Sequence, residues 1–451
     1  MIKKLLIANR GEIALRIIRA AREMGIATVA VYSEIDADSL PVRMADEAVC
    51  VGPAPSIKSY LVQGNIIAAA ENLGADAIHP GYGFLSENAD FARACAENDI
   101  IFVGPSADAI ERMGNKARAR ATAEEADVPV VPGSDGVVET VEEARAFAEK
   151  VGYPVLIKAS AGGGGKGMRV AESADDLESQ FTAARTEAAA AFGNDEVYLE
   201  KYLMRPRHIE IQILADTHGN VVHLFERDCS IQRRHQKLIE EAPSPALTPE
   251  LRATMGEAAV KLARAVDYVG AGTVELLLDT DGSFYFMEMN TRVQVEHPVT
   301  EQITGIDIVK EQLRIASGET LSFTQDDVKM CAHSIEFRIN AEDPLHDFRP
   351  NPGRIDTFMF PGGIGVRVDT HCYPGYSVPP TYDSMIAKLI VWGDTREEAL
   401  ARAARALDEM EIGPIPTTVA FHRAAIQIEA FQRGEVYTDF VDTHEINLEG
   451  A

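Results

Sequence analysis

The chain has 451 residues, of which 46% are hydrophobic, and this length is typical of about three globular domains with large cores. Its 70 acidic residues outnumber its 43 basic residues, and the resulting net charge of −27 would repel nucleic acid and anionic membranes from most of the surface. The five cysteines are far apart and include no CxxC pair, which argues against a disulfide scaffold or a zinc site and favours a reducing, cytoplasmic location.

The first 114 residues alternate between strand and helix patterns. KKLLIA predicts a buried strand, EIALRIIRAAREMG an amphipathic helix and ATVAVYS a second strand. This order is that of a βαβ unit, so we expect an N-terminal doubly wound domain with a parallel sheet. The apolar run that follows the basic start, MIKK, is too short for a signal peptide or a membrane span.

Residues 158–170 read KASAGGGGKGMRV, with four consecutive glycines between two lysines, a composition suited to phosphate. A P-loop ending at Lys166 would need glycine where Ser160 stands and a hydroxyl where Gly167 stands. The GxGxxG spacing is present, but that motif requires a helix to follow, and MRVAES predicts a strand. We therefore expect a hairpin flap over nucleotide phosphates; a surface hairpin without a ligand is the alternative.

A second hairpin is predicted in GTVELLLDTDGSFYFMEMN, where Asp281-Gly282 suits a two-residue turn. That turn places Glu275 opposite Glu288, and two facing carboxylates repel each other unless a cation lies between them. Oxygen ligands without sulfur or imidazole suit Mg²⁺ or Mn²⁺. The sequence therefore predicts a metal site at this pair, with Asn290 beside it.

Polar residues continue to alternate beyond this hairpin. If the segment stays extended, one face carries Glu288, Asn290, Arg292, Gln294 and Glu296. On that face Arg292 would bind an anionic substrate and Glu296 would act as a base. The alternative is a half-exposed strand with a solvated polar face.

A basic cluster lies in RDCSIQRRHQKLIEE. Its basic side chains after the first arginine are Arg233, Arg234, His235 and Lys237. A nucleic-acid interface is disfavoured because the chain is acidic and no aromatic residues interleave the charges. A binding role and an exposed loop paired with Glu240 and Glu241 both remain open.

Several motifs together resemble the biotin carboxylase family of the ATP-grasp superfamily. They are IANRGEIALRIIRAA, HPGYGFLSEN, KASAGGGGKG, EKYL, HIEIQ, RDCSIQRRHQK, MEMNTRVQVEHPVTE and EFRINAEDP, and the resemblance runs from residue 2 to about residue 440. It implies a mixed α/β and α+β fold. The expected parts are an N-terminal βαβ domain (1–114), a linker and ATP-grasp lid (115–204), a central ATP-grasp domain (205–330) and a mixed, β-rich C-terminal domain (331–446).

The resemblance also implies roles for individual residues. For ATP the matching positions are Lys116, Lys158, Gly164, Gly165, Met168, Glu200, Lys201, Tyr202, Leu203, His208, Gln232, His235, Glu275 and Glu288. The metal would bind Glu275, Glu288 and Asn290, and bicarbonate would contact Lys237, Arg292, Gln294 and Val295. Arg338 and Tyr82 would face biotin, and the catalytic set would be Glu296, Arg292, Arg338 and Lys237.

The implied activity is ATP-dependent carboxylation of biotin with bicarbonate, by way of carboxyphosphate, as the first half-reaction of an enzyme such as acetyl-CoA carboxylase in fatty acid biosynthesis. Expected partners are a biotin carboxyl carrier protein, carboxyltransferase subunits and a second copy of the chain. The nearest match to a carrier hairpin is Val328-Lys329-Met330, which we interpret as an ordinary exposed lysine. The alternatives are a ligase of the carbamoyl phosphate synthase type and a non-catalytic nucleotide-binding module.

Overall fold

The computed structural model describes residues 1–159, 168–192 and 194–448. The chain divides into two compact units. The first comprises Met1–Val128, Arg207–Leu276 and Glu288–Ala451, and the second comprises Pro129–Pro206 and Leu277–Met287. None of the helices in the described part of the chain has both the length and the apolar character needed to cross a membrane.

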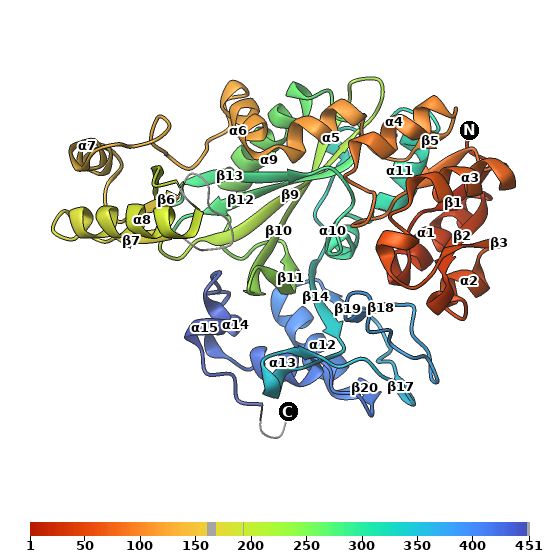
Figure 1. Ribbon diagram of the computed structural model, residues 1–451. Coiled ribbons are helices and arrows are strands. Elements are labelled where there is room, and N and C mark those ends of the chain that lie inside the picture. Colours follow the sequence, from red (N-terminus) through yellow and green to blue (C-terminus); the bar gives the residue numbers. More distant parts are fainter. Residues whose placement is uncertain (160–167, 193, 449–451) are drawn as a thin grey trace. The chain divides into compact units, whose positions relative to one another are not determined.

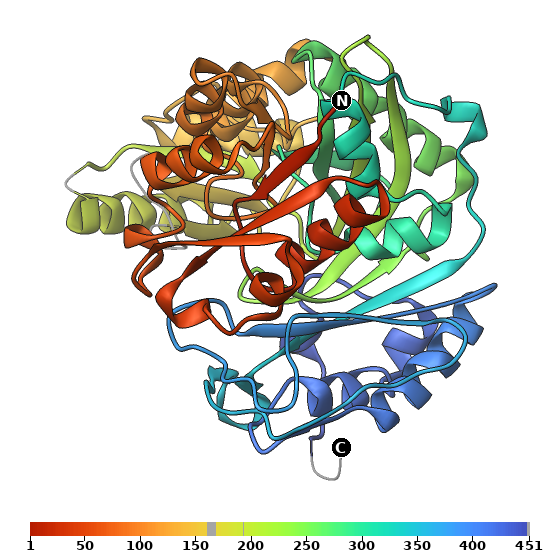
Figure 2. The same cartoon turned by 90° about the vertical axis from the view of Figure 1, so that its right-hand side faces the viewer.

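The N-terminal sheet of the first unit is parallel, with strand order β3-β2-β1-β4-β5. Its strands are β1 (Lys4–Ile7), β2 (Ala27–Ser33), β3 (Glu47–Gly52), β4 (Ala77–His79) and β5 (Ile101–Phe102). The connecting helices include α1 (Gly11–Glu23), α2 (Leu40–Met44), α3 (Gln63–Leu73) and α4 (Ala89–Glu97), drawn in red and orange in Figure 2. The order reverses at β1, as in doubly wound folds, so the predicted N-terminal fold is confirmed.

The second unit contains the three-stranded antiparallel sheet β7-β6-β8. The strands are β6 (Val155–Ala159), β7 (Met168–Ala171) and β8 (Val197–Lys201), and the helices are α7 (Val141–Val151) and α8 (Leu177–Phe192). Lys158 pairs with Met168, which confirms the predicted strands on both sides of the glycines. The glycine turn itself, including Gly164 and Gly165, lies outside the described residues.

The largest described sheet has the order β13-β12-β9-β10-β11-β14-β19-β18 (Figure 1). Its strands are β9 (Arg207–Ala215), β10 (Val221–Arg233), β11 (Gln236–Ala242), β12 (Gly270–Leu278), β13 (Phe284–Asn290), β14 (His333–Asn340), β18 (Val366–Thr370) and β19 (Met385–Gly393). The neighbouring helices are α9 (Pro249–Ala265), α10 (His297–Thr304), α11 (Ile308–Ala316) and α12 (Arg396–Glu409). Because β11 pairs with β14, the sheet continues across residues 330 and 331. The four-part division of the chain stays a prediction.

The turn between β12 and β13 differs from the prediction. The amide of Asp279 donates to the carbonyl of Ser283 at 2.8 Å, and the amide of Gly282 donates to the carbonyl of Asp279 at 3.1 Å. The loop therefore contains three residues, Thr280 to Gly282, and the predicted two-residue turn is wrong. Gly282 has a φ of 86°, the left-handed conformation that closes three-residue hairpin loops.

Candidate active site

A single ammonium group joins three carboxylates from separate segments. Lys237 Nζ donates to Glu210 on β9 at 2.6 Å, to Glu275 on β12 at 2.9 Å, and to Glu296, just before α10, at 2.7 Å. Burial lowers the pKa of Lys237, but the charges of Glu210 and Glu296 outweigh burial and raise the pKa well above its usual value. Lys237 is therefore a fixed cation within a buried acidic cluster.

A tight turn positions Lys237. Arg234 and His235, between β10 and β11, have φ values of 49° and 67°, the left-handed pair that a two-residue hairpin turn requires. The register that follows places Gln232 opposite Lys237. The Lys237 side chain is 12% exposed, whereas that of Arg234 is 73% exposed and binds Asp347 at 3.0 Å. The predicted basic cluster thus separates into one inward lysine and a surface turn.

Glu296 lies between two cations. Its Oε1 accepts from Lys237, and its Oε2 accepts from Arg338 Nη2 at 2.9 Å. Burial raises the pKa of this fully buried carboxyl, but Lys237 and Arg338 more than offset burial and hold the pKa well below its usual range. Arg338 also donates through Nε to Glu240 at 2.5 Å. Glu296 is therefore ionised, which is the form that a proton acceptor needs.

Glu275 accepts from several donors at once. Besides Lys237, Asn290 Nδ2 and Gln294 Nε2 each donate to its Oε1 at 3.0 Å, and His208 Nε2 lies 3.0 Å from its Oε2. With His208 and Glu210, it forms a buried group whose possible ligand atoms all lie within 4.8 Å of one another. This polar centre could hold a metal ion.

The negative charge of Glu288 is balanced by nearby cations less completely than that of Glu275. Burial and the negative charge of Glu275 raise the pKa of Glu288, and Lys116 lowers it only in part. Direct opposition of Glu275 and Glu288 does not follow from the three-residue loop, but the negative charge of Glu275 still acts on Glu288. A divalent cation would relieve the excess negative charge, so these residues fit Mg²⁺ or Mn²⁺. The metal ligands remain a prediction.

The predicted polar strand ends earlier than expected. β13 stops at Asn290, and the chain turns before α10 begins at His297, with Pro298 in the first helical turn. A single extended face from residue 288 to 296 is therefore wrong. The turn still gathers the polar groups, because Arg292 donates to Asn290 at 2.9 Å and to Gln294 at 2.7 Å. Burial of Gln294 and the complete burial of Glu296 also contradict a solvated face.

Glu12 and Lys388, which the sequence analysis did not identify, connect Tyr82 with Val295. Tyr82 donates its hydroxyl hydrogen bond to Glu12 at the start of α1. The fully buried Lys388 on β19 lies 3.3 Å from Glu12 and donates to the carbonyl of Val295 at 2.7 Å. The positions predicted for biotin and for bicarbonate are therefore joined through one lysine.

Sequence reasoning missed several buried charges at the site. They are Glu12, Glu210, Glu336 and Lys388; Glu240, which one interpretation paired with an exposed loop, is also completely buried. Except for Glu12, all lie on strands. A signal was available for three of them, because HIEIQIL, HSIEFRI and MIAKLIV each place a charge directly between two apolar residues of a strand. Such a charge needs a buried partner.

Predicted ATP-binding residues are found in both units. In the second unit, Lys158 binds Glu200 at 2.9 Å, and Met168 is 42% exposed. The amide of Lys201 donates to Pro132 and that of Tyr202 to Pro154, while Leu203 is 9% exposed. Lys116, His208, Gln232 and His235 lie in the first unit with both carboxylates of the predicted metal site. The complete ATP-binding set stays a prediction.

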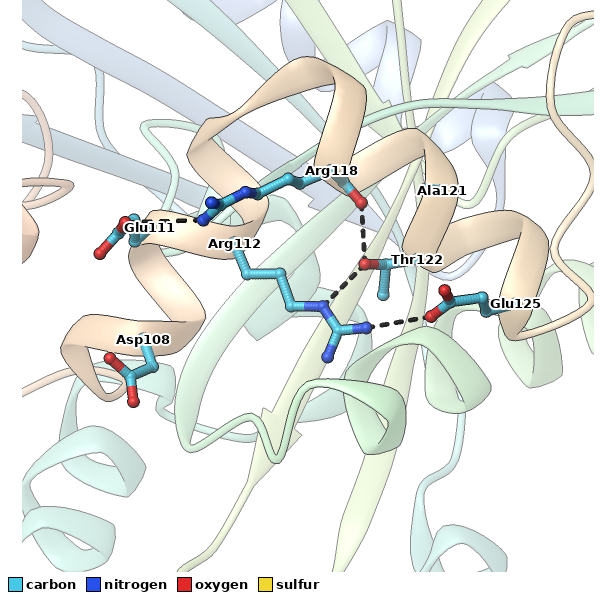
Figure 3. Close-up of a pocket in the computed structure, with 7 residues that line it drawn as sticks. All are labelled: Asp108, Glu111, Arg112, Arg118, Ala121, Thr122 and Glu125. Carbon is cyan, nitrogen blue, oxygen red and sulfur yellow. Dashed lines mark hydrogen bonds and ion pairs between the residues drawn. The ribbon is translucent and has the colours of Figure 1, made fainter.

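A pocket of about 470 Å³ lies between α5 (Ala107–Gly114) and α6 (Lys116–Glu125) (Figure 3). It is lined by Asp108, Glu111, Arg112, Arg118, Ala121, Thr122 and Glu125. Arg112 pairs with Glu125 at 3.2 Å, and Arg118 with Glu111 at 3.6 Å. The seven lining residues include none of the predicted site residues, so this pocket is separate from the cluster around Lys237.

Three family descriptions match the chain in order. Residues 1–110 match "Biotin carboxylase, N-terminal domain", and residues 115–324 match "Carbamoyl-phosphate synthase L chain, ATP binding domain". Residues 336–443 match "Biotin carboxylase C-terminal domain". The middle segment is common to more than one kind of ligase, whereas both flanking segments specify biotin carboxylase.

Similarity to individual proteins extends over nearly the whole chain. Biotin carboxylase 1 of Bacillus subtilis is 60% identical over 99% of each chain. The biotin carboxylase of Haemophilus influenzae is 57% identical, over 96% of this chain and 97% of the relative. A biotin carboxylase domain dimer of Hydrogenobacter thermophilus 2-oxoglutarate carboxylase, solved with MgADP, ADP and bicarbonate, is 51% identical, with a TM-score of 0.86 and 98% coverage of both chains. This agreement, together with the three ordered segments, establishes that the chain belongs to the biotin carboxylase family.

Proposed function

We propose that the chain uses ATP and bicarbonate to carboxylate biotin by way of carboxyphosphate, the first half-reaction of a biotin-dependent carboxylase. The observation that carries this proposal is the placement of the buried Glu296 carboxylate between Lys237 and Arg338. A purely nucleotide-binding module has no need for such a buried, ionised proton acceptor. A ligase of the carbamoyl phosphate synthase type would not account for the match of residues 336–443, which contains Arg338.

Bicarbonate binding would change the basicity of Glu296. Lys237, Arg292, Gln294 and Val295 are the proposed contacts. When the anion draws Lys237 toward itself, Glu296 loses part of the positive charge that depresses its pKa. Its basicity then rises, so Glu296 accepts the bicarbonate proton while a bicarbonate oxygen attacks the γ-phosphorus of ATP. The bond from this phosphorus to the bridging oxygen breaks, which releases ADP and leaves carboxyphosphate.

ATP would be held by the residues that match the family's nucleotide positions, with Lys116 and Lys158 at the phosphates. Mg²⁺ or Mn²⁺ at Glu275 and Glu288, with Asn290 beside them, would supply positive charge to the phosphate oxygens. Support for a cation here comes from the raised pKa of Glu288, which reflects burial and the charge of Glu275. Binding of MgADP by the Hydrogenobacter domain dimer agrees with this proposal.

Arg338 would act at the second step. Carboxyphosphate breaks into CO₂ and phosphate, and this basic phosphate takes the ureido proton of biotin before nitrogen attacks CO₂. Arg338 would leave Glu296 and donate to the oxyanion that develops on the ureido group, with Tyr82 as a further biotin contact. The guanidinium is mostly shielded from water and stays held through Nε by Glu240, so only its Nη2 contact has to change.

Biotin is proposed to arrive on a separate carrier protein. The only near match to a carrier motif holds Lys329, whose Nζ donates to the carbonyl of Asp326 at 2.5 Å, and Val328 beside it is buried. We further propose a homodimer in the cytoplasm that serves acetyl-CoA carboxylase. The acetyl-CoA assignment rests on the sequence resemblance, and copurification with carboxyltransferase subunits would test it.

The two half-reactions separate the proposed roles. Glu296→Ala should abolish bicarbonate-dependent ATP cleavage, whereas Arg338→Ala should retain slow cleavage but lose on the order of 10² to 10³ in biotin carboxylation rate. Phosphate release and carboxylation of free biotin are measured in parallel, with Arg234→Ala as a control at an exposed surface turn. Normal biotin carboxylation by Arg338→Ala, or bicarbonate-stimulated ATP cleavage by Glu296→Ala, would contradict the assigned order.

A further inference from the structure

Next to Arg338, the carboxyl groups of Glu240 and Glu336 face each other across neighbouring strands. The register of β11 and β14 pairs Glu240 directly with Glu336. Both residues are completely buried. Carboxylates directly opposite each other in an antiparallel pair repel, and burial strengthens that repulsion because water does not screen it.

Hydrogen bonds satisfy only one of the four carboxyl oxygens. Glu240 Oε1 accepts from Arg338 Nε at 2.5 Å. Glu240 Oε2 and both oxygens of Glu336 are buried without a hydrogen-bond partner. Two ionised carboxylates would leave these acceptors unpaired, which is costly in a buried site. One proton between the two groups would give the pair a donor.

Charged groups from several elements act on the pair. Arg338 and Glu296 act on both carboxyls, Lys237 acts on Glu240, and Lys388 on β19 acts on Glu336. From α10, His297 contributes no positive charge near neutral pH, because burial and nearby cations hold its pKa well below the usual value. The cations therefore compensate one carboxylate of the pair better than two.

We propose that Glu336 carries this proton and that the ionised Glu240 is a positioning residue that aims Arg338 at the biotin oxyanion. The proposal rests on the function proposed above. Glu240 is the better anion because it alone has the short contact to Arg338. Glu336 is the better acid because no cation donates to it.

The titration behaviour of the two groups agrees with this geometry. Burial and the charge of Glu240 raise the pKa of Glu336 well above its usual value, although Lys388 acts in the opposite direction. Burial also raises the pKa of Glu240, but attraction to Arg338 limits the rise to about 7. Above about pH 8, Glu240 is therefore ionised and the proton resides on Glu336.

This arrangement has a consequence for the reaction. Arg338 is held through Nε by Glu240 and through Nη2 by Glu296. When the substrate oxyanion draws Nη2 away from Glu296, Glu240 keeps the planar guanidinium oriented. A second negative charge at Glu336 would hold the arginine more strongly and compete with the oxyanion.

Two isosteric substitutions test the proposal. Glu336→Gln resembles the protonated acid, so the rate of biotin carboxylation should stay within about threefold of wild type. Glu240→Gln removes the anion that orients Arg338, so kcat for biotin carboxylation should fall roughly 10- to 100-fold, as when an orienting partner is lost. Its KM for ATP and its bicarbonate-dependent ATP cleavage should remain close to wild type.

Infrared difference spectroscopy reads the proton directly. The wild type at neutral pH should show a carboxylic acid C=O band that Glu336→Gln lacks. Absence of this band, normal carboxylation by Glu240→Gln, or equal losses in both variants would overturn the proposal. If Glu336→Gln does not fold, a wild-type titration decides: a buried carboxylic acid band must persist above about pH 8, where Glu240 is ionised. The band does not depend on turnover, so it tests the proton assignment by itself. Normal biotin carboxylation by Arg338→Ala would instead show that the proposed function is wrong.

Discussion

Replacement of Lys237 with methionine should be among the most damaging single changes at the site. Methionine keeps an unbranched side chain but removes the ammonium that binds Glu210, Glu275 and Glu296. The three carboxylate side chains are at most 6% exposed, so water cannot replace the lost cation. The variant would retain its packing but hold uncompensated negative charge.

The expected magnitude follows from this burial. Removing one partner of a buried ion pair typically costs about 3–5 kcal/mol, because the remaining charge stays desolvated. Unfolding entropy of about 2 cal/mol/K per residue gives roughly 1 kcal/mol/K for a chain of this length. The melting temperature should therefore fall by about 3–5 °C near pH 8, if unfolding is cooperative.

The deficit should depend on pH in a defined direction. In the wild type, burial raises the pKa values of Glu296 and Glu275, but nearby cations more than offset burial and depress both values. The two ionised groups therefore stabilise the fold at pH values above their unfolded pKa. This stabilisation is lost as the pH falls through the folded pKa. Without Lys237, burial raises both pKa values relative to the wild type, and the carboxylates can take up protons in acid. The difference between wild type and variant should therefore shrink from about pH 8 to about pH 5.5.

Thermal unfolding at both pH values measures the effect, and Lys237→Met should also abolish bicarbonate-dependent ATP cleavage. Lys261→Met is the matched control, since Lys261 is an exposed lysine on α9. Equal melting temperatures for wild type and Lys237→Met near pH 8, or a deficit that grows in acid, would refute the assignment of Lys237 as the cation that balances the cluster.

Two further predictions concern metal and biotin. Glu288→Gln should weaken binding of the metal–nucleotide complex without lowering the melting temperature, because burial and the charge of Glu275 already disfavour an ionised Glu288; unchanged Mg²⁺ dependence in nucleotide titrations would count against the paired site. Avidin blotting of the purified chain should be blank, because Lys329 lies in no carrier-like hairpin; a strong band at the chain's own mass would contradict the separate carrier.

Local patterns in the sequence predicted the elements that depend on neighbouring residues. The alternation in KKLLIA and EIALRIIRAAREMG predicted β1 and α1, and the strands around the glycines were correct as well. The motif resemblance gave the family and its activity, which the comparisons confirm. The errors arose where one residue decides geometry: Gly282 closes a longer turn than predicted, and Pro298 favours a helix after the polar strand ends.

The pairing of distant strands was beyond local patterns. Glu240 meets Glu336 because β11 pairs with β14, and Lys388 joins the site because β19 pairs with β14. No turn connects β11 directly to β14, since residues 243–332 lie between them. A charge inside an apolar strand reveals that a partner is needed, but the identity of that partner depends on which strands become neighbours.

The charge balance around Glu296 bears on the requirement for bicarbonate. Lys237 and Arg338 both bind Glu296, so the two cations are occupied and the proposed base is only weakly basic. Under the proposed mechanism, an anion that competes for Lys237 weakens this hold, which raises the basicity of Glu296 at the moment when its substrate is present. Water is neutral and offers no such competition. The same ion pairs that hold Glu296 in place therefore favour ATP cleavage with bicarbonate over cleavage with water.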